Sequence, residues 1–243
     1  MITKIIMKNL NSKIFVSYNG GSGGDFFTNC CNGIDLAFVP TKTVVKGSQS
    51  LKPFEYQINK DISTLPNFID QLNPGYISTH LLEPLVESYK VINVIIKDIK
   101  TIESAIQRQM MYQQLKIDIN PKENWYQIIS AWCLAGKFDK AAIFWYEKAN
   151  QRWKDFMKQR IKYQNITTLN FDNLFSEVFV NDLINQGWNH NINILKKNHE
   201  LWLIKNKEFS KEATIESMSK KLAKMDWQQS SGTIIYSINK DNN

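Results

Sequence analysis

The chain has 243 residues, 43% of them hydrophobic, and a formal net charge of +7 at neutral pH. This length can bury one full core, so we expect a single domain over residues 1–243, with a helix-rich C-terminal part from about residue 120. No window is apolar for long enough to cross a bilayer and no signal peptide is recognisable, so we expect a cytoplasmic protein without membrane contact. The positive charge permits an anionic partner.

The first predicted element is a strand over residues 14–18, which passes through four glycines into a helix over residues 24–32. An irregular, proline-punctuated stretch follows, with one short predicted helix over residues 65–72. Residues 75–80 form the second predicted strand and, after a helical connection, residues 91–96 form the third. The continuous apolar run of this third strand is typical of a parallel strand covered on both faces.

The rest of the chain is mainly helical. We expect helices over residues 101–116, 125–135, 138–164, 171–186 and 192–207, with a short strand over residues 167–170. The alternation of strands and helices in the first part predicts an α/β fold with a mainly parallel sheet, right-handed crossovers and a covering helical layer. A last predicted strand, residues 233–238, either joins the edge of that sheet or pairs with another subunit, and the sequence leaves both open.

Cysteine and histidine usage argues against disulfides and metals. Two of the three cysteines, Cys30 and Cys31, are adjacent, and such a pair does not easily form an unstrained bridge. The three histidines show no metal-ligand spacing, so we expect no metal. Aromatic and basic residues alternate from Trp153 to Arg160, which is more typical of helix packing than of a nucleic-acid surface, and we expect no nucleic-acid partner. The oligomeric state is not indicated.

The glycine-rich loop between the first strand and the first helix is a candidate anion site. Backbone N–H groups converge at a helix N-terminus, and the absence of Cβ atoms lets a phosphate come close. The loop is not a Walker A motif, because Asp25 and Phe26 follow Gly24 where that motif has a lysine and a hydroxyl. Asp25 would also repel an incoming phosphate. A tight turn that needs small residues is the alternative interpretation, and both stay open.

Four segments in order carry a resemblance to a known family. They are the glycine loop, Ser78-Thr79-His80-Leu81, Lys97-Asp98-Ile99-Lys100 and the segment 168–174. Over residues 13–174 this order resembles the sulfotransferase family, whose motifs are Pro-Lys-Ser-Gly-Thr-Thr, Lys-Thr-His-Leu-Pro, Arg-Asn-Pro-Lys-Asp and Tyr-Glu-Asp-Leu. The resemblance implies a P-loop-type three-layer fold and a nucleotide-binding transferase that uses phosphoadenosine phosphosulfate (PAPS) as sulfuryl donor. The acceptor would be a small molecule or a glycan.

Carried over by position, the resemblance implies the following site. The loop residues that would hold the donor are Gly20, Gly21, Ser22, Gly23, Gly24 and Asp25. His80 falls on the general base and Lys97 on the arginine that grips the ribose phosphate. The family's assisting serine corresponds to Ala105, with Ser104 one place away, and we expect Ser104 to take that part. A histidine suits the base because it titrates near neutral pH.

The departures from the family concern positive charge. Gly21 and Ser78 stand where the family has lysines, so charge on the leaving phosphate must be stabilised by Lys97, Lys100 or another residue such as Arg108. Our leading hypothesis is therefore sulfuryl transfer from PAPS to a hydroxyl or amine. A catalytically inactive binding or structural module of the same fold is the alternative. A divergent nucleotide kinase is a third, which would need a magnesium ligand that the sequence does not show.

Each candidate residue also has a purely structural interpretation. His80 can be a strand-end histidine bonded to a backbone carbonyl, and Ser104 a plain helix-surface residue. Lys97 and Lys100 can lie with their ammonium groups in solvent at a helix start. For Asp172, we favour an N-cap role for a helix beginning at Asn173 over a part in the chemistry.

Overall fold

The computed structural model describes residues 13–35, 49–112, 124–163, 166–206, 210–230 and 233–238. The chain divides into two compact units, one made of Met1–Ala105 with Asp155–Lys207 and the other of Ile106–Lys154 with Glu208–Asn243. The expectation of a single domain stays a prediction. Among the described residues, no helix is both long enough and apolar enough to traverse a bilayer.

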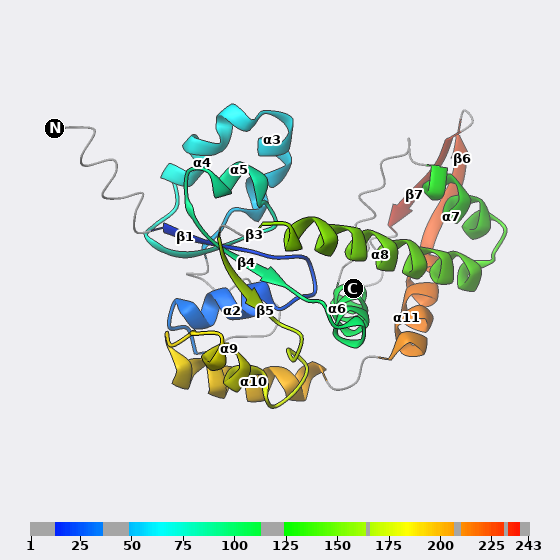
Figure 1. The fold of residues 1–243 in the computed structure, drawn as a ribbon. Helices are drawn as coiled ribbons and strands as arrows, with labels where there is room; N and C mark the ends of the chain where they lie inside the picture. Colours follow the sequence, from blue (N-terminus) through cyan, green and yellow to red (C-terminus); the bar gives the residue numbers. More distant parts are fainter. Residues whose placement is uncertain are drawn as a thin grey trace. The chain divides into compact units, whose positions relative to one another are not determined.

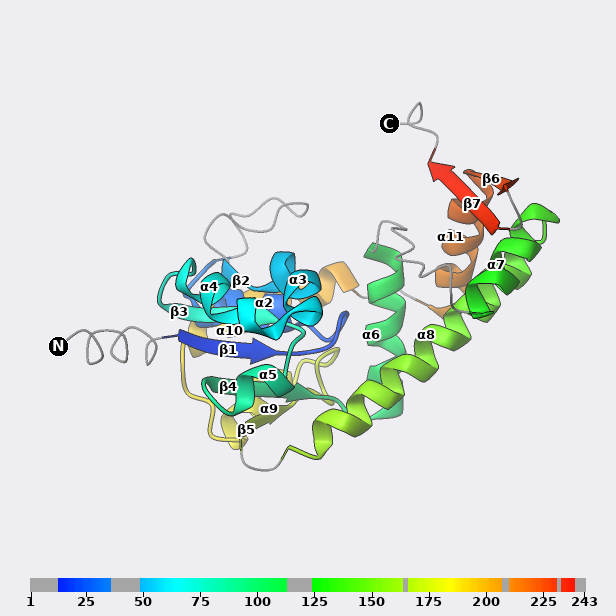
Figure 2. The same ribbon diagram turned by 90° about the horizontal axis from the view of Figure 1, so that it is seen from above.

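The first unit contains a parallel five-stranded sheet. Its strands are β1 (Lys13–Ser17), β2 (Gln49–Ser50), β3 (Gly75–Thr79), β4 (Lys90–Ile95) and β5 (Thr167–Asn170). They lie in the order β2-β3-β1-β4-β5, and every pairing is parallel. The parallel course of β1 and β4 can be followed in Figure 2. The α/β fold and the parallel central sheet that we predicted are confirmed.

Helices cover both faces of this sheet, which gives the first unit three layers (Figure 1). One layer contains α3 (Glu55–Lys60), α4 (Leu65–Asp70) and α5 (Glu83–Val86), with the short 3-10 turns Lys52–Phe54 and Ile62–Thr64. The opposite layer contains α2 (Gly24–Cys31), α9 (Phe179–Asn185) and α10 (Ile192–Asn206). Both faces of a parallel sheet are usually buried in this way, which is why its strands read as apolar runs.

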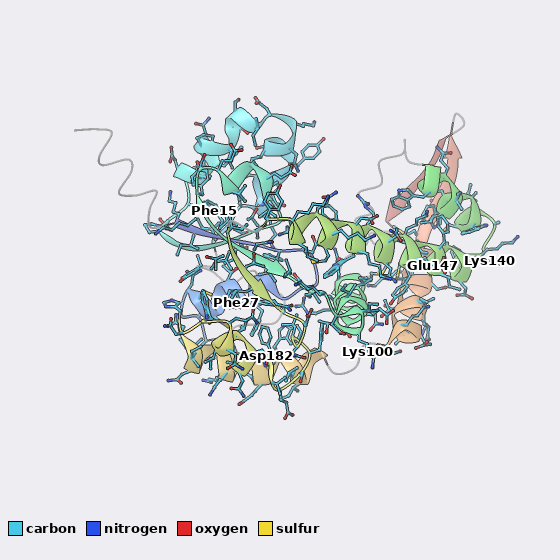
Figure 3. All side chains as sticks on the ribbon, viewed as in Figure 1. Phe15, Phe27, Lys100, Lys140, Glu147 and Asp182 are labelled. Atoms are coloured by element: carbon cyan, nitrogen blue, oxygen red, sulfur yellow. The ribbon has the colours of Figure 1, made fainter. Side chains whose placement is uncertain are left out.

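The two sides of the sheet have different cores. On the α3–α5 side, Phe15 of β1 belongs to a cluster of buried aliphatic side chains that includes Ile58, Ile77 and Leu85. On the α2 side the core is aromatic, and the Phe27 ring lies 5.2 Å from Phe171 (centroid to centroid). Figure 3 shows Phe15 and Phe27 on these opposite sides. Successive strand residues point to opposite faces, so β1 contributes to both cores.

The second unit holds a small antiparallel sheet and helices. Its elements are α7 (Asn124–Leu134), α11 (Lys211–Ala223), β6 (Met225–Ser230), β7 (Thr233–Ile238), and parts of α6 (Ile99–Tyr112) and α8 (Phe138–Ile161). β7 is the predicted C-terminal strand, but it pairs with β6 and not with the edge of the parallel sheet. We did not predict β6, because its sequence Met-Asp-Trp-Gln-Gln-Ser lacks a strand-like apolar pattern.

One predicted helix is wrong in its first half. We expected residues 171–186 to be helical, whereas α9 begins only at Phe179. The segment before it makes consecutive turns, closed by the bonds from Leu174 N–H to the Phe171 carbonyl and from Ser176 N–H to the Asn173 carbonyl. The other helices that we predicted are present, apart from the stretches that lie outside the described residues.

Candidate functional site

The carboxyl ends of β1, β3 and β4 lie side by side, because β1 pairs in parallel with both of the others. The glycine loop follows β1, His80 follows β3 and Lys97 follows β4, so the topology brings these predicted motifs to one edge of the sheet. After β1 the chain crosses beyond β3 to form β2 at one edge of the sheet, whereas after β4 it forms β5 at the opposite edge. Open α/β sheets bind ligands at such a divergence.

Backbone conformation or packing explains three of the loop glycines without any ligand. Gly21 (φ 84°) and Gly23 (φ 72°) adopt left-handed backbone conformations that residues with a Cβ rarely accept. Gly24 begins α2 against the ring of Tyr18, and a Cβ atom on Gly24 would lie 1.9 Å from that ring. The tight-turn interpretation therefore explains these three glycines.

Ser22 supports the loop from inside. It is fully buried, and its N–H and hydroxyl both donate to the Asn19 carbonyl oxygen, at 3.1 and 2.6 Å. Gly20 and Gly21 are half-buried and Asp25 is exposed, whereas Gly23 and Gly24 are buried. Of the predicted donor-binding residues in the loop, only Gly20, Gly21 and Asp25 thus present surface to solvent in this structure.

Asp25 accepts hydrogen bonds from one cation and one hydroxyl. Lys52 Nζ donates to Oδ2 at 2.5 Å, and the Tyr18 hydroxyl donates to Oδ1 at 2.6 Å. Neighbouring protein atoms partly desolvate the Asp25 carboxyl and act to raise its pKa, but Lys52 and Tyr18 outweigh this and the pKa lies below its usual value. The carboxylate that we expected to repel an anion is therefore paired. Lys52 also brings an ammonium group to the loop, where the sulfotransferase lysine is missing.

His80 is held by a carboxylate. Glu55 Oε2 lies 3.1 Å from His80 Nδ1, while Oε1 accepts the His80 backbone N–H at 2.6 Å and the Thr79 hydroxyl at 2.8 Å. The Glu55 side chain is 13% exposed and that of His80 is 43% exposed. Burial acts to raise the pKa of Glu55, but the contacts with His80 and Thr79 outweigh it, so Glu55 is ionised at neutral pH. The backbone-carbonyl partner considered for His80 is not what its ring contacts.

The Glu55 carboxylate determines which nitrogen of the neutral His80 ring carries the hydrogen. An ionised carboxylate only accepts hydrogen bonds, so in the neutral imidazole the hydrogen lies on Nδ1. Nε2 then carries the lone pair, as a general base requires. The His80 and Tyr18 rings also pack in a T-shaped arrangement, with centroids 5.2 Å apart.

Arg160 lies under this edge of the sheet. It is 3% exposed and comes from the last turn of α8. Its guanidinium donates to Ser17 Oγ, Asn93 Oδ1 and the carbonyl oxygens of Tyr18 and His80, at 2.8–3.2 Å. Burial lowers the pKa of Arg160 to about 10, which still leaves it protonated at neutral pH. Arg160 is thus a buried cation next to the loop and His80.

The end of β4 is fixed by Asp172. Its Oδ1 accepts the backbone N–H groups of Lys97 and Asp98, and no helix begins at Asn173. The N-cap role that we favoured for Asp172 is therefore wrong. The N-terminus of α6 is capped by Asp98, whose Oδ2 accepts the Thr101 N–H at 2.8 Å. Aligned hydrogen bonds from Thr101 hold the pKa of Asp98 below its usual value.

The remaining predicted residues lie along α6 and its approach. Lys97 and Lys100 are exposed, and Figure 3 labels Lys100 near the start of α6. The Ser104 hydroxyl donates to the Lys100 carbonyl oxygen at 3.0 Å, a bond within α6. This bond agrees with the surface interpretation of Ser104. Arg108 belongs to the second unit.

The sequence interpretation missed Lys52, Glu55 and Arg160. No local pattern marks Lys52 or Glu55, because each acts through a contact with a residue more than twenty positions away. Arg160 had a signal. It lies on one helical face with Trp153 and Met157, which are buried, and a charged residue on an apolar face is unusual. Within the described part of the chain, no group of three or more His, Cys, Asp or Glu side chains is placed to hold a metal ion.

Comparisons with protein-family models, with characterised proteins and with solved structures each found no match to this chain.

Proposed function

We propose that the carboxyl edge of the parallel sheet transfers a sulfuryl group from PAPS to a hydroxyl or amine acceptor, with His80 as general base. The observation that carries the proposal is the Glu55–His80 pair, which lies where the loops after β1, β3 and β4 meet. A carboxylate that orients an exposed imidazole beside a glycine loop is an arrangement suited to proton abstraction. The sulfotransferase resemblance of the segments around the site supplies the reaction class.

The reaction assigns a task to each group. The acceptor oxygen or nitrogen bonds to sulfur, while the bond between sulfur and the bridging phosphate oxygen breaks. The acceptor proton passes to His80 Nε2, and the electron pair of the broken bond stays on the phosphate. Lys52, Lys97 and the amides of Gly20 and Gly21 are the groups that would stabilise the phosphate charge. This assignment replaces the family's loop lysine with Lys52, a residue that follows β2.

Ligand binding is the first test. Phosphoadenosine phosphate, the donor without its sulfuryl group, should raise the melting temperature of the wild-type protein by several degrees, because a ligand at about 100 times its Kd adds about 2.7 kcal/mol to stability. Lys97→Ala should reduce that shift, and Lys196→Ala, which removes an exposed lysine on α10, should not. Transfer of radiolabelled sulfate to a panel of alcohols and amines should then be lost in His80→Gln. Unchanged transfer in that variant would remove His80 as the base.

A second function is favoured by the loop itself. Gly21, Gly23 and Gly24 are explained by backbone conformation and by packing, and Ser22 is turned inward. These are the features expected of a binding or structural module that keeps the fold without catalysis. Such a protein would show no melting-temperature shift with phosphoadenosine phosphate, ATP or inorganic sulfate.

A further inference from the structure

Arg160 has a role that packing alone does not explain. Its guanidinium makes four hydrogen bonds to described residues, all to uncharged acceptors, and the Glu55 carboxylate acts on it only through space. Burying a charge without a hydrogen-bonded carboxylate is costly, and an apolar residue of similar size would serve a helix-to-sheet contact at least as well. The arginine must therefore be accounted for by what its bonds arrange.

Those bonds connect three strands. Nη1 donates to Ser17 Oγ of β1 at 2.9 Å and to Asn93 Oδ1 of β4 at 3.2 Å. Asn93 Nδ2 in turn donates to the Arg160 carbonyl oxygen at 3.0 Å, so the two residues bind each other in both directions. This reciprocal pair explains why an asparagine lies fully buried in the apolar run of β4.

Nη2 joins the loop to the base. It donates to the carbonyl oxygen of Tyr18, which precedes the glycine loop, at 3.2 Å, and to that of His80 at 2.8 Å. One nitrogen thus binds both the start of the loop and residue 80, in addition to the bonds from Tyr18 N–H to the Thr79 carbonyl and from the Ser17 hydroxyl to the Leu81 carbonyl. On its other side, the His80 backbone N–H is held by Glu55. Opposite charges therefore hold His80 at its N–H and at its C=O, and Glu55 also holds the ring.

We propose that Arg160 is a positioning residue that fixes His80 relative to the glycine loop, and so sets the geometry between the base and the bound donor. The inference rests on the proposed function for its catalytic meaning, but the arrangement of His80 can be measured without a substrate. Lysine cannot replace Arg160 fully, because an ammonium group lacks the planar fork that reaches four acceptors at once.

The test compares Arg160→Met, Arg160→Lys and Arg152→Met. Arg152 is exposed on the same helix and serves as the matched control. The first measurement is the pair of imidazole ¹⁵N chemical shifts of His80, which report which ring nitrogen carries the hydrogen. The His80 signals are assigned because they disappear from the spectrum of His80→Gln. Wild type and Arg152→Met should show hydrogen on Nδ1. Arg160→Met should show mixed tautomers and at least tenfold faster exchange of the His80 amide, and Arg160→Lys a smaller change in both.

The outcomes separate positioning from stability. A folded Arg160→Met protein whose His80 tautomer and amide exchange match wild type would overturn the proposal, whatever its melting temperature. Should Arg160→Met not fold, Arg160→Lys decides in the same way, since it keeps the charge. In sulfate transfer, Arg160→Lys should lower kcat at least tenfold with less than threefold change in KM for the donor. If the wild-type protein does not bind the donor, the proposed function is refuted. The imidazole measurement would still decide whether Arg160 positions His80.

Discussion

Replacing Gly24 by alanine tests whether the glycine loop is shaped by Tyr18. A Cβ on Gly24 would lie 1.9 Å from the Tyr18 ring, and ordinary contact begins at 3.4 Å, so the ring would have to retreat by about 1.5 Å. Tyr18 is 2% exposed and its hydroxyl is bonded to Asp25, which leaves it little room to move. Alanine itself suits the helical backbone of Gly24, so packing decides the outcome.

The expected loss of stability follows from overpacking. Forcing extra atoms into a packed site typically costs about 1–3 kcal/mol, and the better helix propensity of alanine returns up to about 1 kcal/mol. A net loss of about 2 kcal/mol would lower the melting temperature of a chain of this size by roughly 4–8 °C. Urea unfolding followed by circular dichroism measures the same difference as a shifted midpoint with an unchanged slope.

A double-mutant cycle identifies the cause. In a Tyr18→Leu background the clash is gone, so Gly24→Ala should be neutral or stabilising there. Gly187→Ala is the control, because Gly187 has φ +88° and nothing within 4 Å of an added Cβ. Its cost should be the same in both backgrounds. Should Gly24→Ala be equally destabilising with and without Tyr18, the packing explanation of this glycine would be wrong.

Three further predictions concern charged and polar groups. Asp172→Ala should lower the free energy of unfolding by about 1–2 kcal/mol, because two backbone amides before α6 lose their acceptor. Burial lowers the pKa of His199, so the unfolded chain binds more protons and stability should fall as pH drops from about 7 to about 5. Lys52→Met should raise the pKa of the Asp25 carboxyl, seen by NMR titration, because its main attractive partner is lost.

The first two of these have control variants, and the third has an outcome that would contradict it. Glu177→Ala removes an exposed acidic residue near Asp172 in sequence and should leave the urea midpoint unchanged. His199→Gln should abolish the part of the pH dependence that belongs to His199, and an identical pH profile in that variant would contradict the assignment. An unchanged Asp25 titration in Lys52→Met would mean that the 2.5 Å ion pair does not persist in solution.

The elements with strong local patterns were predictable. The apolar run of β4 and the strand–glycine–helix succession of β1 and α2 are both present, and the parallel sheet follows from their alternation with helices. The turn before α9 was not predictable, because the Asp172 side chain bonds to amides some 75 positions earlier in the chain and not to a local helix. Local propensity cannot anticipate a side chain whose partner is distant in sequence.

The candidate site likewise has a part that the sequence predicts and a part that it does not. The approach of His80, Lys97 and the loop to one edge depends on the parallel direction of the strands, which the sequence pattern predicts, and on their order, which it does not. The groups that define their chemistry come from elsewhere: Glu55 from α3 and Arg160 from α8. Glu55 is an ordinary charged residue in sequence, whereas Arg160 is marked only by its place on an apolar helix face.

The absence of a lysine from the glycine loop therefore does not leave the candidate site without positive charge. Lys52 reaches the loop from the end of β2, and Arg160 lies buried beneath it, so two cations are present that no motif comparison would align with the family's lysine. They are not equivalent, because Lys52 is engaged by Asp25 whereas Arg160 bonds only to uncharged acceptors. An anion near the loop would meet the charge of Arg160, on which the Glu55 carboxylate acts through space but without a hydrogen bond. The charges that act on such a site are therefore identified from their positions in the structure and not from their order in the sequence.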